Sequence, residues 1–160
     1  MKQLGLTLLE VMIALAMLAI VASLALPSFG AAAERARLKS AAETLAADIA
    51  DARFEAAQRG QAFNIDFKTG ADWCWSVAMA PGCSCGTAQA CQLKTVQGKD
   101  HAGIELLQAG ATRLDPTGPA DGGAALFQSS RGDRLRVELS RLGRASICAA
   151  AGTLPGYPAC

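Results

Sequence analysis

The sequence has few of the residues from which enzyme active sites are built. It contains one histidine, His101, and only 5% of its 160 residues are aromatic. No serine or cysteine forms a catalytic-triad pattern with His101. The formal net charge is +1, so bulk charge argues neither for nor against nucleic acid, and an anionic partner would have to be met by a local patch. We therefore expect a chain that is not an enzyme and that needs no cofactor.

Charge is nearly absent from the N-terminal part of the chain. From Leu8 to Leu26 the only charged residue is Glu10. As a helix, this stretch would cover about 28 Å, close to the hydrocarbon thickness of a bilayer, so we predict a membrane span over about residues 8–26. A cleaved secretory signal is the alternative, but its apolar stretch is shorter and needs no carboxylate. Since a charge in an apolar helix costs about 2.5–3.5 kcal/mol on insertion, Glu10 should have a partner.

The segment Gly5-Leu6-Thr7-Leu8-Leu9-Glu10 resembles the type IV prepilin motif, in which a glycine and an apolar residue precede Thr-Leu and a glutamate. The resemblance implies that a prepilin peptidase cleaves between Gly5 and Leu6 and methylates the new amine of Leu6, where the family usually has Phe. In a filament, Glu10 would pair with the amine of a neighbouring subunit. That pair would set the register, because leaving either charge alone in an apolar helix bundle is costly. The alternative is a Glu10 that only reaches the membrane interface.

After the apolar stretch, Pro27 is expected to break or kink the helix. A helical pattern resumes at Ala31 and ends near Gly60, a predicted C-cap. One face of this second half carries an apolar stripe formed by Leu38, Leu45, Ile49, Ala52 and Ala56, and the charged residues Asp48, Asp51, Glu55 and Arg59 lie off it. We therefore predict one long helix with a membrane half and an amphipathic half.

Beyond Gly60 the pattern becomes that of strands. We predict strands at 62–67, 73–79, 124–128, 135–140 and 144–148, a strand end at Leu114, and loops at 80–103 and 152–160. The predicted fold class is α+β, with the long N-terminal helix packed on a small antiparallel β head domain. The predicted organisation is a leader at 1–5, the helix at 6–60 and a periplasmic head at 61–160.

Cysteine is absent from the first 73 residues, and all six cysteines lie in the head, at Cys74, Cys83, Cys85, Cys91, Cys148 and Cys160. An even number in a small domain behind a membrane segment suggests disulfides in an oxidising compartment. Six cysteines allow 15 pairings. We favour Cys148–Cys160 and expect Cys74 to pair within the 83–91 loop. A zinc site that adds His101 to Cys83, Cys85 and Cys91 is the alternative, but this spacing fits zinc poorly.

A second resemblance covers most of the chain. The helix end at Ala52–Gln61, the strand with Trp73 and Trp75, and the segment from Leu139 to Cys148 are similar to the H-type pseudopilins and FimT-type minor pilins. The resemblance implies a minor subunit near a filament tip. FimT-type pilins carry a C-terminal "GRxR" motif implicated in DNA capture. The matching segment here, Gly143 to Ser146, keeps only the first arginine.

Arginines crowd the segment 131–144. Four of them are candidate DNA contacts, since guanidinium groups bind phosphate bidentately: Arg134, Arg136, Arg141 and Arg144. The alternative is a solvated strand face, because Arg134, Arg136 and Glu138 alternate with apolar residues. The serine at position 146 favours this alternative.

Three hypotheses follow. The chain is a minor pilin that helps to initiate a type IV pilus, an H-type pseudopilin of a type II secretion system, or a filament-tip DNA receptor for competence. The cysteines and the partial arginine motif favour the pilus. The expected partners are other pilins or pseudopilins, the prepilin peptidase, the membrane and, for the third hypothesis, DNA. The expected location is the bacterial inner membrane, with a single span and the head in the periplasm, and then a filament.

Overall fold

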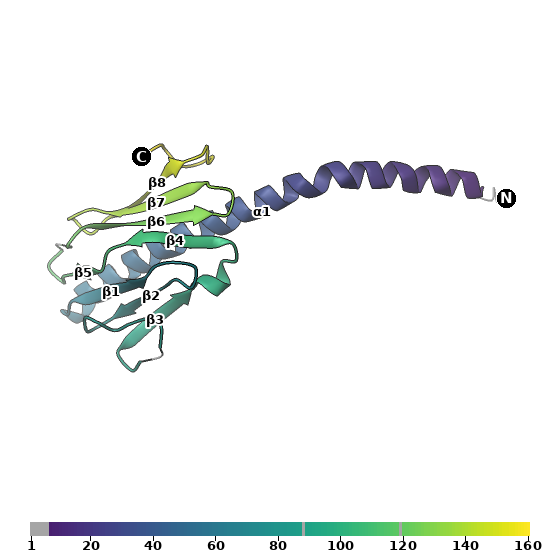
Figure 1. The fold of residues 1–160 in the computed structure, drawn as a ribbon. Helices are drawn as coiled ribbons and strands as arrows, with labels where there is room; N and C mark the ends of the chain where they lie inside the picture. The colour runs from purple at the N-terminus through teal and green to yellow at the C-terminus, as the bar shows by residue number, and fades with distance from the viewer. Residues whose placement is uncertain (1–6, 88, 119) are drawn as a thin grey trace, which may run out of the picture. The chain divides into compact units, whose positions relative to one another are not determined.

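The structure is a computed structural model that describes residues 7–87, 89–118 and 120–160. It falls into two units, Met1–Ala33 and Glu34–Cys160. The long helix α1 covers Leu8–Arg59 and therefore contributes to both (Figure 1). The second unit begins well before residue 61, because the buried face of the C-terminal half of α1 belongs to the same core as the strands.

Helix α1 continues through Pro27, so the helix does not break at this residue, and a kink there stays a prediction. Proline removes one amide donor, and the turns on either side continue the helix. The helix ends as predicted, at Arg59, with Gly60 in the left-handed region at φ 63°. The amide of Gln61 donates to the carbonyl of Ala56 at 3.3 Å, which satisfies one of the last free carbonyls of the helix.

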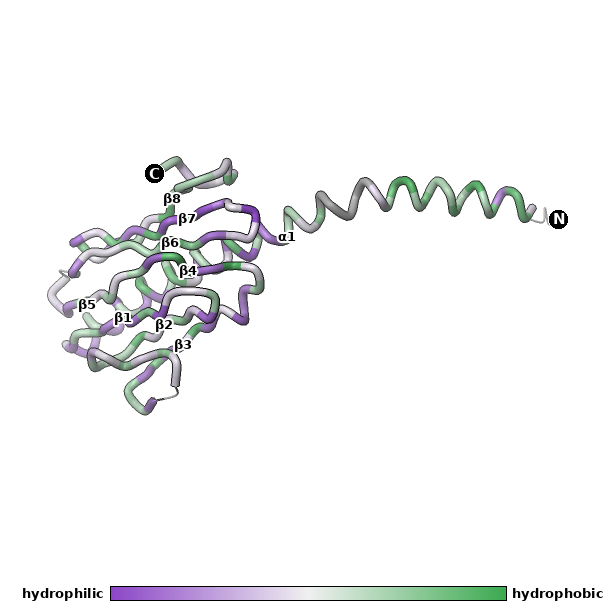
Figure 2. The backbone as a smooth tube through the Cα atoms, in the orientation of Figure 1, coloured by the Kyte–Doolittle hydropathy of each residue, from purple (hydrophilic) through white to green (hydrophobic). Residues whose placement is uncertain are grey.

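The N-terminal turns of α1 are mostly hydrophobic (Figure 2). The sequence predicts a membrane span over about residues 8–26. Among the residues that the structure describes, no helix is long and apolar enough to cross a membrane.

The head contains two antiparallel four-stranded sheets, which we name A and B. Sheet A has the order β3-β2-β1-β5. Its strands are β1 (Phe63–Lys68), β2 (Cys74–Ala78), β3 (Gln92–Gln97) and β5 (Thr112–Leu114). A short 3-10 helix, η1 (Gly98–Asp100), follows β3. The register pairs Phe67 with Trp75 and Ile65 with Val77, so large apolar side chains share one face of the sheet.

Sheet B has the order β4-β6-β7-β8, and these strands lie side by side in Figure 1. They are β4 (Ile104–Ala109), β6 (Gly123–Ser129), β7 (Arg134–Leu139) and β8 (Ala145–Ala151). In β7, Leu135, Val137 and Leu139 are buried and alternate with more exposed polar residues. This alternation is typical of a sheet with one face on the core and the other in water.

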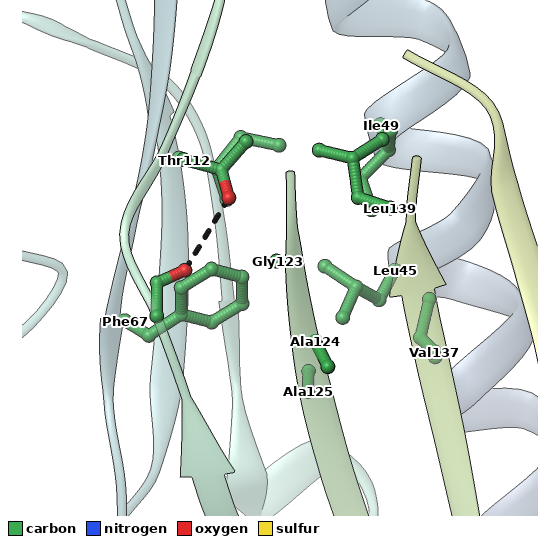
Figure 3. Close-up of a pocket in the computed structure, with 11 residues that line it drawn as sticks. Leu45, Ile49, Phe67, Thr112, Gly123, Ala124, Ala125, Val137 and Leu139 are labelled. Carbon is green, nitrogen blue, oxygen red and sulfur yellow. Dashed lines mark hydrogen bonds between the residues drawn. The ribbon is translucent and has the colours of Figure 1, made fainter. Parts of the chain in front are cut away.

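One core joins α1 to both sheets. The predicted apolar stripe of α1 is buried throughout, from Leu38 to Ala56. Figure 3 shows Leu45 and Ile49 of the helix beside Val137 and Leu139 of sheet B, across from Phe67 of sheet A. The space between these side chains is only about 10 Å³, which is room for roughly one water molecule. The predicted α+β class is confirmed.

Asp48 corrects the predicted helix pattern, because it lies on the buried side of α1 and is only 2% exposed. Its carboxylate accepts a hydrogen bond from the indole N–H of Trp75 at 2.8 Å and forms an ion pair with the Lys94 ammonium at 2.5 Å. A buried charge requires such partners. Asp48 therefore links α1 to strands β2 and β3.

Two strands were not predicted. β3 lies within the segment 80–103, which the sequence predicts to be a loop. β4 lies where the sequence predicts no defined element. β3 is an edge strand with mostly polar side chains, so it lacks an apolar alternation. In β4 the alternation begins with Ile104 and Leu106, but a register shift between Leu106 and Gln108 interrupts it. A bulge of this kind moves the following side chains to the other face.

Candidate functional site

The first turn of α1 contains the predicted assembly residue. The backbone N–H of Glu10 donates to the hydroxyl of Thr7 at 3.3 Å and to its carbonyl at 3.1 Å. Thr7 is thus the N-cap of the helix, and Thr7-Leu-Leu-Glu10 has the spacing of a capping box. The glutamate also places a negative charge in the first turn, where the helix dipole favours it. The processing site at Gly5 and Leu6 lies outside the described residues.

The helix around Glu10 exposes an unusual amount of apolar surface. The large side chains between residues 8 and 21 are 45–80% exposed: Leu8, Leu9, Val11, Met12, Ile13, Leu15, Met17, Leu18, Ile20 and Val21. Apolar exposure on this scale marks a surface that another apolar phase or another helix covers. The arrangement can therefore present one carboxylate within an apolar contact surface.

The six cysteines form three disulfides. Cys148 is joined to Cys160, the bridge favoured from the sequence, and the two Cα atoms are 5.0 Å apart. Cys74 is joined to Cys85 within the expected 83–91 loop, and Cys83 is joined to Cys91. The zinc alternative is therefore wrong, because its three thiols are used in bridges. His101 instead stacks on Trp73 with ring centroids 5.8 Å apart, and burial lowers the pKa of its imidazole.

The last bridge fastens the C-terminal tail to the edge of sheet B. The amide of Ala149 in β8 donates to the carbonyl of Pro158, and the amide of Cys160 donates to the carbonyl of Ala149. The tail also reaches α1, where the hydroxyl of Tyr157 donates to Glu43. Burial and the Glu43 carboxylate raise the pKa of Tyr157 to about 12. The tail thus covers an edge strand that would otherwise be open to pairing with another chain.

Removing this bridge with Cys148→Ser and Cys160→Ser together should lower the free energy of unfolding. The bridge closes a sequence separation of 12 residues, for which the chain-entropy estimate is about 3 kcal/mol. The measurement is denaturant unfolding of the full-length chain, with Ala159→Ser as a control that leaves both sulfurs in place. An unfolding midpoint equal to that of the parent chain, or free thiols in the denatured and unreduced parent, would contradict the prediction.

The candidate DNA contacts do not form one free cationic patch. Arg134 donates to the side-chain oxygen of Gln128 at 2.6 Å, and Arg136 forms an ion pair with Glu138 at 3.4 Å. Both lie on β7, with Arg141 and Arg144 in the turn that follows. At the start of the arginine-rich segment, Arg131 forms an ion pair with Glu34 of α1 at 3.0 Å. A hydrogen bond from Ser130 is the main cause that lowers the pKa of Glu34.

Two family models match the chain. The model described as "Type II transport protein GspH" matches residues 41–143 and thus covers the C-terminal end of α1 and most of both sheets. The chain belongs to this family. A second model, described as the prokaryotic N-terminal methylation motif, matches residues 1–26. The predicted resemblance is therefore confirmed: the chain is a minor pilin or pseudopilin, and it is structural rather than enzymatic.

Solved structures share the fold of the GspH-family chain. The type IV minor pilin FimU of Pseudomonas aeruginosa (strain PAO1) superposes with a TM-score of 0.56 at 23% identity, over 71% of this chain and 90% of that one. The minor pseudopilin EpsH from the Type 2 Secretion System of Vibrio cholerae gives a TM-score of 0.54 at 14% identity, over 72% and 99%. At these identities the likeness concerns the fold alone. A search of curated proteins found no match.

Membership of this family carries general consequences for the chain. A pilin with the methylation motif is processed by a prepilin peptidase, is anchored in the inner membrane and assembles with other pilins into a filament. Two features of the structure were not predicted from the sequence: the burial of Asp48 and the groove that Phe54 lines. Both depend on residues that are distant in sequence, and no local pattern indicates either one.

Proposed function

We propose that this chain is an H-type minor pseudopilin, which joins the pseudopilus of a type II secretion system. The observation that carries the proposal is the match of residues 41–143 to the GspH family, since this segment contains strands β1 to β7 of the head. The N-terminal motif does not discriminate, because pilins and pseudopilins share it. The six cysteines and the partial arginine motif favour a type IV pilus, and the family match favours the alternative, a type II secretion system.

In the proposed assembly, the N-terminal end of α1 contacts neighbouring subunits. Cleavage between Gly5 and Leu6 leaves a methylated, positively charged amine on Leu6, and Glu10 of one subunit pairs with the amine of its neighbour. The exposed apolar side chains at 8–21 support this contact, because they need to be covered. The head then lies at the outer part of the filament and offers its own surfaces to other subunits.

A role as a DNA receptor has less support. The second arginine of the GRxR motif is missing, and Arg136 is already paired with Glu138. Neutralised guanidinium groups contribute little to the counterion release that drives binding to duplex DNA. We therefore keep DNA as an alternative outcome of the experiments below.

The test is deletion of the gene in the source bacterium. We expect the substrates of type II secretion to remain in the periplasm and to reappear in the medium when the wild-type gene is returned. Surface pili and the motility that depends on them should be unchanged in the same strain. Normal secretion together with lost pili would show that the chain is a type IV minor pilin instead.

A further inference from the structure

An open groove lies between α1 and the turn that joins β7 to β8. Its volume is about 520 Å³. One wall is the helix, with Ala46, Ala50 and Ala57 and the larger Arg53 and Phe54. The other wall is Gly143–Ala145. Arg53, Phe54 and Ala57 on one wall and Gly143–Ala145 on the other belong to segments in which the sequence resembles H-type pseudopilins, so the fold brings these two segments together.

Large apolar side chains are exposed at this groove. Phe54 lines it and is 62% exposed, and Leu142, next to Gly143 in the turn, is 72% exposed. Within the described part of residues 34–160, the other exposed large hydrophobic side chains are Met79 and Leu93, which are 44% and 45% exposed. An exposed aromatic side chain beside an apolar hollow is typical of a protein–protein contact site.

Positive charge borders the same groove. Arg53 and Arg144 both line it, and neither forms an ion pair with any residue that the structure describes. The Arg53 side chain passes close to the turn: a Cβ atom on Gly143 would lie 3.1 Å from its Cδ and Nε, and Gly143 has φ 71°. Glycine therefore suits this position, because another residue would be strained and would displace the arginine side chain. The groove presents two free positive charges over an apolar floor.

We propose that this groove docks a helix of a neighbouring pilin-like subunit, and that the docked face is apolar with one carboxylate directed at Arg53 and Arg144. The small side chains of Ala46, Ala50 and Ala57 allow another helix to approach closely, since the interaxial distance depends on the side chains at the contact. Charge complementarity fixes the partner and its orientation. The apolar floor argues against duplex DNA, whose backbone is met by basic and polar groups.

This inference rests on the proposed function, because it names the surface through which the head contacts its filament neighbours. The first experiment places a photo-crosslinking amino acid at position 54 of the full-length chain in the source bacterium. Asp51, an exposed residue of the same helix that lines a different hollow, is the matched control position. We expect an adduct with another pilin-like subunit from position 54 and none from position 51, and mass spectrometry identifies the crosslinked peptide.

The second experiment reverses the charge at the groove. Arg144→Glu should reduce both the adduct and the incorporation of the chain into sheared filaments by about tenfold or more. Arg141→Glu makes the same charge change in the same turn outside the groove lining and should stay within about twofold of the parent. Replacing the acidic residue of the crosslinked partner peptide with arginine should restore incorporation of the Arg144→Glu chain. Thiol counts of the variants, with all six cysteines oxidised, show that the head has folded.

The outcomes separate the inference from the proposed function. A chain that enters filaments normally with Arg144→Glu, or that gives equal adducts from positions 51 and 54, overturns the groove while leaving the pseudopilin intact. The groove is also overturned if position 54 gives adducts only with lipid or only with duplex DNA. Equal loss of DNA binding in Arg141→Glu and Arg144→Glu would support the DNA outcome. A chain absent from every filament fraction, the parent included, contradicts the proposed function itself.

Discussion

A chain with Glu10→Gln is expected to reach the membrane and to be processed, but to fall by about tenfold or more in sheared filaments. Glutamine keeps the length and shape of the side chain, so the change removes only the charge. In the filament, it leaves the amine of the neighbouring Leu6 without its partner in an apolar helix bundle, where an unpaired charge is costly. Insertion itself should become easier, since the charge has a transfer cost in an apolar helix.

The measurement is immunoblotting of the membrane and filament fractions. Glu55→Gln is the matched control, because it removes a carboxylate from the same helix where that group forms only a surface pair with Arg59. Intact mass should show that both variants begin at a methylated Leu6. Normal filament incorporation of Glu10→Gln would contradict the pairing, and a mature chain that begins after residue 20 would indicate an ordinary secretory signal instead.

Local patterns predict those parts of the fold in which each residue's environment follows from its near neighbours. The stripe from Leu38 to Ala56 is such a case, because the helical period alone places these residues on one face. The strands with clear alternation, such as β7, are another. Strand β3 could not be predicted in this way, since its polar side chains reflect its position at the sheet edge, which local sequence does not encode.

The candidate sites also divide into those formed by residues close in sequence and those formed by distant segments. The motif around Glu10 is contiguous, so the sequence displays it complete, and the Cys148–Cys160 bridge closes a short loop. The Cys83–Cys91 bridge and the groove beside Phe54 depend on which segments the fold brings together. Clustering in sequence likewise does not fix the partners of the arginines: Arg131 and Arg136 form ion pairs with separate acidic residues, and DNA contact by the four candidate arginines stays a prediction.

The buried carboxylate of Asp48 is expected to have a large effect on the stability of the head, similar to that of the Cys148–Cys160 bridge. Asp48→Ala should lower the free energy of unfolding by about 3 kcal/mol. The change leaves the indole N–H of the fully buried Trp75 without an acceptor, and an unsatisfied buried donor carries its full desolvation cost. The partner Lys94 contributes less, because its side chain is 52% exposed and can turn to water.

Three further variants separate these contributions in unfolding experiments followed by tryptophan fluorescence on the full-length chain. Asp48→Asn keeps an acceptor for Trp75 and should cost about 1 kcal/mol, and Lys94→Met should cost about 1 kcal/mol or less. Asp51→Ala, one turn along the helix and exposed, should stay within about 0.5 kcal/mol of the parent. If Asp48→Ala were no more destabilising than Asp51→Ala, the link from α1 to β2 through Trp75 would contribute nothing. The apolar stripe alone would then hold the helix to the sheets.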